Sequence, residues 1–124
     1  MNAPLSTLAL SVLALVALSG CSGEPSLTYQ GNVKALLDAK CVSCHIPGGP
    51  GYEKSGLRLD SYDAMMKGTK FGPVVVAGSS VSSTLYRLVS GQADPSIRMP
   101  HGQAALPEAD VQMIAAWIDQ GAKY

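Results

Sequence analysis

The sequence predicts a small, mainly α-helical domain with several short helices, and three observations support this fold class. Apolar side chains recur on one helical face over 33–41, at positions i, i+3, i+4 and i+8. A second apolar stripe covers 111–118, with Pro107 in the first turn and Gly121 at the end. The strand-like run 73–77 has no second strand with which it could form a sheet.

Shorter helices are expected between these two, and capping and turn residues mark their ends. Asn32 is expected to cap the first helix, and the Pro/Gly-rich stretch 47–51 is expected to be a loop. Asp60 is expected to cap a helix over 61–67, which ends at Gly68.

A further helix is predicted in the second half of the chain. Ser79 or Ser80 is expected to cap it, its apolar side chains lie within 85–89, and it ends at Gly91. Residues 92–105, which include two prolines, are expected to form a loop.

The composition indicates one domain and excludes a nucleic-acid partner. The chain has 124 residues, with nine basic and nine acidic side chains and no net charge. It contains no basic run that could bind nucleic acid. With one Trp, one Phe and five Tyr, the chain has few large rings for a core. A small domain of this kind would gain from a large apolar cofactor.

The N-terminal segment has the pattern of an export signal. Its first 20 residues carry no charged side chain, and the apolar run 8–18 is shorter than the roughly 20 residues that span a bilayer. The run ends in Leu-Ser-Gly-Cys at 18–21, which resembles the lipobox of bacterial lipoproteins. We therefore expect 1–20 to be a signal peptide of the lipoprotein type and Cys21 to carry a lipid anchor.

This interpretation places the protein in the bacterial cell envelope, as a periplasm-facing or outer-membrane lipoprotein. Residues 21–28 are then a lipidated tether that joins the domain to a membrane. The alternative is an ordinary cleaved signal peptide in which Cys21 is incidental.

The motif Cys41-Val42-Ser43-Cys44-His45 is the attachment signature of c-type haem. Two cysteines three residues apart can each form a thioether bond with one haem vinyl group. The histidine that follows can bind the iron. We therefore expect one covalent haem c, held by Cys41 and Cys44, with His45 as an iron ligand.

Three other sites could use the same residues. A thioredoxin-like C-x-x-C pair requires a βαβ context, which a mostly helical chain does not offer. A zinc site would have to combine Cys41 and Cys44 with His45 and His101. An iron–sulfur cluster requires four thiolates, and only two remain if Cys21 carries lipid.

The second axial position of the iron has several candidates. The possible ligands are Met65, Met66, Met99, Met113 and His101. Met99 is favoured because it lies in a loop before the last helix, where Pro100 would stiffen the chain. His101 is the main rival, and a position open to small ligands is the third possibility.

The order of these parts resembles class I cytochromes c, and more closely the small domains called planctomycete-type cytochrome c. The similar segments follow the haem motif in order and are 56–62, 72–73, 85–87, 98–100 and 117–122. The resemblance covers about 29–122. It implies a class I cytochrome c fold over 29–124, in which short helices surround the haem. The first and last helices cross, with Trp117 at their contact.

The resulting expectation is an extracytoplasmic electron-transfer protein with His45/Met99 ligation. It would not be an enzyme, because the sequence offers no convincing set of catalytic acids, bases or nucleophiles. Its partners would be unidentified redox proteins and, through Cys21, a membrane. The alternative is a peroxidase-like haem enzyme or small-ligand sensor, in which His101 acts beside a displaceable Met99.

Finer expectations concern the surroundings of the haem. A backbone carbonyl of 47–51 is expected to accept the Nδ1–H of His45. Arg58 is expected either to pair with a haem propionate or to lie in solvent. The side chains expected to line the pocket are Leu57, Leu59, Tyr62 and Leu85.

Overall fold

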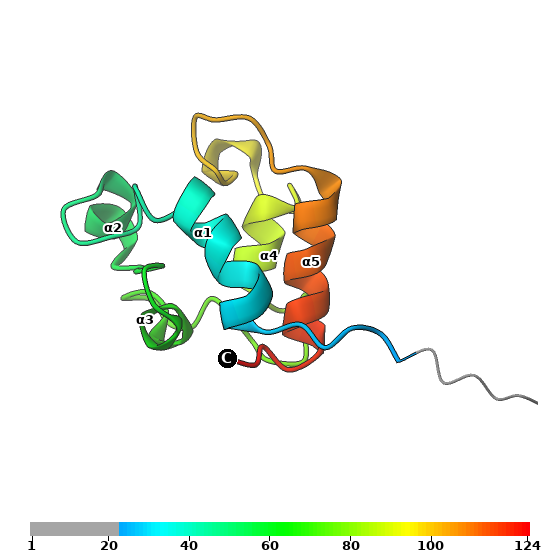
Figure 1. Cartoon of the computed structure of the whole chain (residues 1–124). Coiled ribbons are helices and arrows are strands. Elements are labelled where there is room, and N and C mark those ends of the chain that lie inside the picture. The colour runs from blue at the N-terminus through cyan, green and yellow to red at the C-terminus, as the bar shows by residue number, and fades with distance from the viewer. Residues whose placement is uncertain (1–22) are drawn as a thin grey trace, which may run out of the picture.

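The computed structural model describes residues 23–124, so the expected signal peptide and Cys21 lie outside the described part (Figure 1). The helical elements are η1 (Tyr29–Val33), α1 (Lys34–Lys40), α2 (Pro50–Ser55), α3 (Tyr62–Lys67), α4 (Thr84–Val89), η2 (Pro95–Ile97) and α5 (Glu108–Asp119). Over residues 23–124 the β-type backbone pairing amounts to one isolated bridge, between Thr69 and Gly72. The predicted mainly α fold is confirmed.

The first helix begins earlier than predicted, because its cap is Thr28 and not Asn32. The Thr28 hydroxyl accepts a hydrogen bond from the Gly31 N–H at 2.9 Å, and Asn32 Oδ1 accepts one from the Thr28 N–H at 3.0 Å. This reciprocal pair resembles a capping box, in which two otherwise unpaired N–H groups are satisfied at once. The first turn, η1, is a π-helix that continues directly into α1.

The stretch 47–51 is a loop only as far as Gly49, because α2 begins at Pro50. A proline fits the first turn of a helix, where the missing N–H is not needed. Helix α2 ends at Gly56, which has a left-handed φ of 74°. The Pro-Gly pair in the sequence therefore marks a helix start and not a continued loop.

Two other caps are shifted along the chain. Helix α3 is capped by Ser61, whose hydroxyl accepts from the Ala64 N–H at 3.3 Å, while Asp60 is paired with Arg58. Helix α4 begins at Thr84, after Ser83 and not after Ser79 or Ser80. The buried Ser83 hydroxyl accepts from the Val76 N–H and donates to the Ser79 carbonyl, so it fastens the preceding turn.

The core joins the two ends of the chain. Turn η1 packs against α5, and Trp117 of α5 is fully buried and donates its Nε1–H to the Lys123 carbonyl at 2.8 Å. The predicted stripe of α5 is buried at each of its four positions, Val111, Ile114, Ala115 and Ile118. Burying one large apolar side chain contributes about 1.5–3 kcal/mol, so this contact is a main source of stability.

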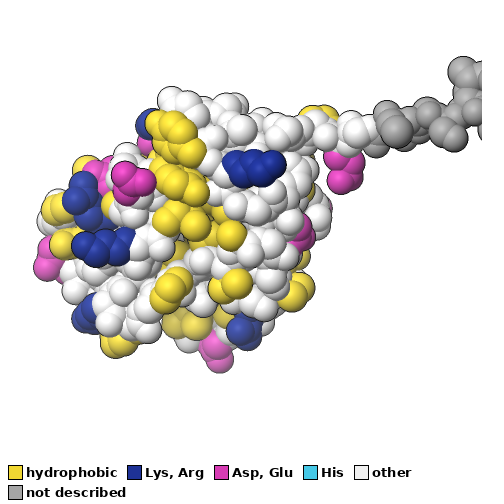
Figure 2. All heavy atoms as spheres, turned by 90° about the horizontal axis from the view of Figure 1, so that it is seen from below, with side chains coloured by type: hydrophobic (Ala, Val, Ile, Leu, Met, Phe, Trp, Pro, Cys, Tyr) yellow, Lys and Arg dark blue, Asp and Glu magenta, His cyan; other side chains and the backbone are white. Residues whose placement is uncertain are grey.

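Charged side chains are spread over the surface. On the face shown in Figure 2, charged side chains of both signs lie on either side of a band of hydrophobic side chains. No helix within 23–124 has the length and apolar character needed to cross a membrane.

Candidate cofactor site

A largely apolar cavity of about 400 Å³ lies among the end of α1, helices α2 and α4, and the loop before α5. Its wall contains Cys41, Cys44, His45, Met99 and His101. Apolar side chains supply much of the remaining wall: Leu57, Leu59, Val74, Leu85, Leu88, Val89 and Ile97. This volume is within the range of about 300–1,000 Å³ that cofactor and small-molecule sites occupy.

The haem signature forms a compact turn at the end of α1. The Cys41 N–H continues the helix by donating to the Leu37 carbonyl at 2.9 Å. The Cys44 and His45 N–H groups both donate to the Cys41 carbonyl, at 3.2 and 3.0 Å. This turn places both thiols and the imidazole along the same cavity.

Helix α2 packs so closely against this turn that there is no room for a Cβ at position 51, in the helix, or at position 49, just before it. A Cβ on Gly51 would lie 2.7 Å from Cε1 of His45, and a Cβ on Gly49 would lie 2.5 Å from the Cys44 carbonyl oxygen. The Cys44 carbonyl also accepts the Tyr52 N–H at 3.0 Å. The glycines therefore let α2 confine the His45 ring.

The His45 ring is in a state that suits a metal ligand. Burial lowers its pKa, and the Leu57 backbone opposes this effect more weakly, so the surroundings favour the neutral imidazole. Neutral imidazole is the form that binds iron. Nδ1 is buried without a hydrogen-bond partner, so the expected bond to a carbonyl of 47–51 is not formed. An unpaired buried polar group costs about 1–3 kcal/mol, which suits a functional ring better than a structural one.

The loop before α5 brings Met99 and His101 into the wall. The Met99 N–H donates to the Leu88 carbonyl of α4 at 3.1 Å, and its side chain is half-buried. His101 also lines the cavity but is exposed. Met65 is fully buried in the core, as a space-filling methionine would be. Met113 is half-buried on α5 and does not line the cavity.

The alternative sites fit these residues poorly. Burial first, and then the charge of Cys44, raises the pKa of the Cys41 thiol to about 11, whereas catalytic C-x-x-C thiols have lowered pKa values. Within residues 23–124, no three His, Cys, Asp or Glu side chains gather as a metal site. The zinc and thioredoxin-like interpretations therefore lose support, and a covalent haem fits the wall.

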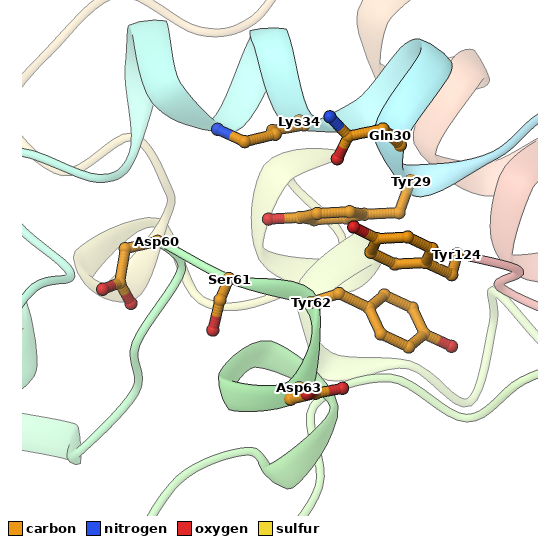
Figure 3. A pocket seen from close by; sticks show the side chains of 8 residues that line it. All are labelled: Tyr29, Gln30, Lys34, Asp60, Ser61, Tyr62, Asp63 and Tyr124. Carbon is orange, nitrogen blue, oxygen red and sulfur yellow. The ribbon is translucent and has the colours of Figure 1, made fainter.

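Tyr62 does not line the cavity, and Arg58, which was expected either to pair with a haem propionate or to lie in solvent, is partly exposed. Arg58 makes a two-pronged ion pair with Asp60, at 2.7 Å from Nη2 and 3.1 Å from Nε. Tyr62 lies in a separate hollow lined by tyrosine rings and polar side chains, where the centre of its ring is 5.4 Å from the ring centres of both Tyr29 and Tyr124 (Figure 3). That hollow contains no cysteine, histidine or methionine, so it does not compete as a haem site.

The structure adds Lys40 and Lys54 to the wall, which were not predicted there. Lys40 directly precedes Cys41, so its place next to the motif was a signal that could have been used. Lys54 could not have been placed, because helix α2 itself was not predicted.

The comparisons with known proteins agree with this geometry. The family model described as planctomycete cytochrome C matches residues 41–103. Both ends of the match, Cys41 and Gln103, lie in the cavity wall. No curated protein and no solved structure matches the chain.

Proposed function

Because this chain belongs to the planctomycete cytochrome c family, we propose that it is an extracytoplasmic electron carrier with one covalent haem c. Membership of this family implies haem binding and electron transfer in general. In our proposal Cys41 and Cys44 form the two thioether bonds, and His45 and Met99 are the axial ligands.

One observation supports this assignment most strongly. A single cavity brings together two cysteines and a histidine from 41–45 and a methionine more than 50 residues later. The thioether of Met99 and the imidazole of His45 are the ligand pair of high-potential cytochromes c, where methionine raises the potential. When bound, haem supplies an iron that alternates between ferric and ferrous states.

The chain's own residues then have four tasks. Cys41 and Cys44 hold the porphyrin, and the apolar wall of α4 and 57–59 excludes water from its faces. Glycines 49 and 51 keep α2 against the His45 ring. The Leu88 carbonyl holds the backbone of Met99. None of these tasks requires a catalytic acid, base or nucleophile.

The cellular part of the proposal rests on the sequence. The uncharged residues 1–20 and the lipobox-like Leu-Ser-Gly-Cys at 18–21 support a lipid anchor on Cys21. We accordingly propose a lipoprotein of the bacterial cell envelope that exchanges electrons with other redox proteins.

One observation favours a second candidate function. His101 lies in the same wall as Met99 and is exposed, so it could act on a small ligand if Met99 dissociated. In that case the protein would be a peroxidase-like enzyme or a small-ligand sensor.

Absorption spectra of the oxidised and reduced holoprotein distinguish the two. For the carrier we expect a low-spin c-type spectrum with the weak far-red methionine–ferric band, which Met99→Ala abolishes and His101→Ala preserves. We also expect slow, weak binding of carbon monoxide and cyanide by the wild type. A high-spin wild type, or a wild type that lacks the band and whose spin state changes in His101→Ala, would support the alternative.

A further inference from the structure

The side-chain amide of Gln120 fastens the segment before the first helix to the end of α5. Gln120 Oε1 accepts the Leu27 N–H at 2.8 Å, and its Nε2 donates to the Pro25 carbonyl at 3.3 Å. Next to it, the Tyr29 N–H donates to the Lys123 carbonyl at 2.8 Å. The chain therefore leaves the fold in a fixed direction at this end.

The cofactor cavity lies toward the other end of the fold. Its exposed wall residues include Lys40 at the end of α1 and Ile97, His101 and Gln103 in the loop before α5. Gln120 follows the last residue of α5, whose 12 residues span about 18 Å. Figure 1 shows the same separation, with the loop before α5 at the top and the outgoing chain at the bottom right.

The connection from the expected anchor to this clamp is short. Five residues separate Cys21 from Leu27, and the six Cα–Cα steps between these two residues reach at most about 20–22 Å when fully extended. An anchor on Cys21 would therefore hold the Gln120 end of the domain close to the membrane surface.

We propose that Gln120 is an orienting clamp, which points the cavity away from the membrane and toward a redox protein in the aqueous compartment. This inference rests on the lipid anchor of the proposed function. It also specifies the class of partner. A redox carrier dissolved in the lipid would meet the clamp end of the domain, whereas a protein in the aqueous phase meets the cavity end.

The test uses the full-length, haem-loaded lipoprotein in phospholipid vesicles that contain a nickel-chelating lipid. The three native cysteines are consumed by lipid and haem in the proposal, so a single added cysteine can carry a nitroxide spin label. One variant, Lys123→Cys, labels the clamp end, and the other, Ala105→Cys, labels the exposed loop before α5. Spectra are recorded in the reduced state, in which low-spin iron is diamagnetic.

We expect surface-bound nickel to relax the label at 123 strongly and the label at 105 weakly. Adding Gln120→Ala should reduce this difference, because the domain can then rotate about a freed tether. Gln112→Ala is the matched control, since this glutamine of α5 is exposed and its amide bonds only to Glu108. The control should preserve the difference.

The possible failures are distinct. Equal relaxation at both positions, or stronger relaxation at 105, in vesicle-bound protein overturns the orientation and leaves the anchor intact. A difference that survives Gln120→Ala shows that Gln120 is not the clamp. Protein that does not bind vesicles at all overturns the anchor of the proposed function, and the orientation with it.

Discussion

The two sides of the cavity are built in different ways. On the His45 side, the N–H groups of Cys44, His45 and Gly49 bond within 41–51, and helix α2 leaves no space for a Cβ at two positions. On the Met99 side, the residues from Gly91 to His101 are mostly exposed. There one backbone hydrogen bond, from Met99 to Leu88, joins the loop to α4 at the ligand.

This difference indicates where each side is sensitive to change. Where this turn packs directly against α2, it tolerates almost no added volume, because neighbouring atoms would have to move. An exposed loop adapts to new side chains, but it depends on the few hydrogen bonds that fix its course. We therefore expect packing changes to act on the His45 side and hydrogen-bond changes to act on the Met99 side.

The largest effect is expected for Gly51→Ala. In a helix, alanine is more favourable than glycine by up to about 1 kcal/mol, so helix propensity alone predicts stabilisation. The new Cβ would instead meet His45 Cε1 at 2.7 Å and Nε2 at 2.9 Å. Overpacking of this kind costs about 1–3 kcal/mol. Thermal unfolding and the yield of haem-loaded protein should both show a loss.

The control for this change is Gly23→Ala, because no atom of the described residues 23–124 lies within 4 Å of the Cβ that it adds. The control should retain wild-type stability and haem content. If Gly51→Ala were as stable as the wild type or more stable, the proposed confinement of His45 by α2 would be wrong.

On the His45 side, the sequence predicted the helix that leads into the motif, because that information is local, but it did not predict α2. The C-x-x-C-H spacing and the apolar face of 33–41 depend on neighbours along one helix, and both lie where they were expected. The four-position stripe of α5 was predicted for the same reason.

The sequence could not predict which residue caps each helix, because neighbouring side chains compete for the same hydrogen bonds. Asp60 was expected to cap α3, but Arg58 binds its carboxylate, so Ser61 takes that position. The side chain of Asn32 does accept a capping hydrogen bond, from the Thr28 N–H. Asn32 itself lies inside the helix, because the Thr28 hydroxyl takes the cap position. Each cap had two candidates within a few residues, and only tertiary contacts decide between such candidates.

An intermediate effect is expected on the Met99 side from Asp94. Its Oδ1 accepts the Ser96 N–H at 2.8 Å and also the Ser96 hydroxyl, which begins the turn η2 just before the ligand loop. These bonds lower the pKa of Asp94. The stability that these bonds contribute is therefore fully present above the unfolded-state pKa of Asp94, and it is lost as the pH falls through the folded-state pKa.

Acid titration of the far-red methionine–ferric band tests this prediction. We expect Asp94→Ala to lose the band at a higher pH than the wild type. Asp94→Asn keeps a capping oxygen without the charge, so it should retain the band at neutral pH. The intensity of its band should depend less on pH in the acid range. Identical titrations for all three proteins would show that η2 does not support the loop that contains Met99.

The smallest effect is expected for Arg58→Ala, although arginine beside a haem pocket is a natural candidate for a propionate partner. Its guanidinium is already engaged by Asp60 in a two-pronged pair, and the arginine side chain is 44% exposed. Exposed pairs of this kind contribute little, because water screens both charges. A redox titration should therefore give the wild-type potential. A clear shift would mean that Arg58 exchanges Asp60 for a propionate when haem is bound, and that the His45 side is less rigid near 58–60 than at 41–51.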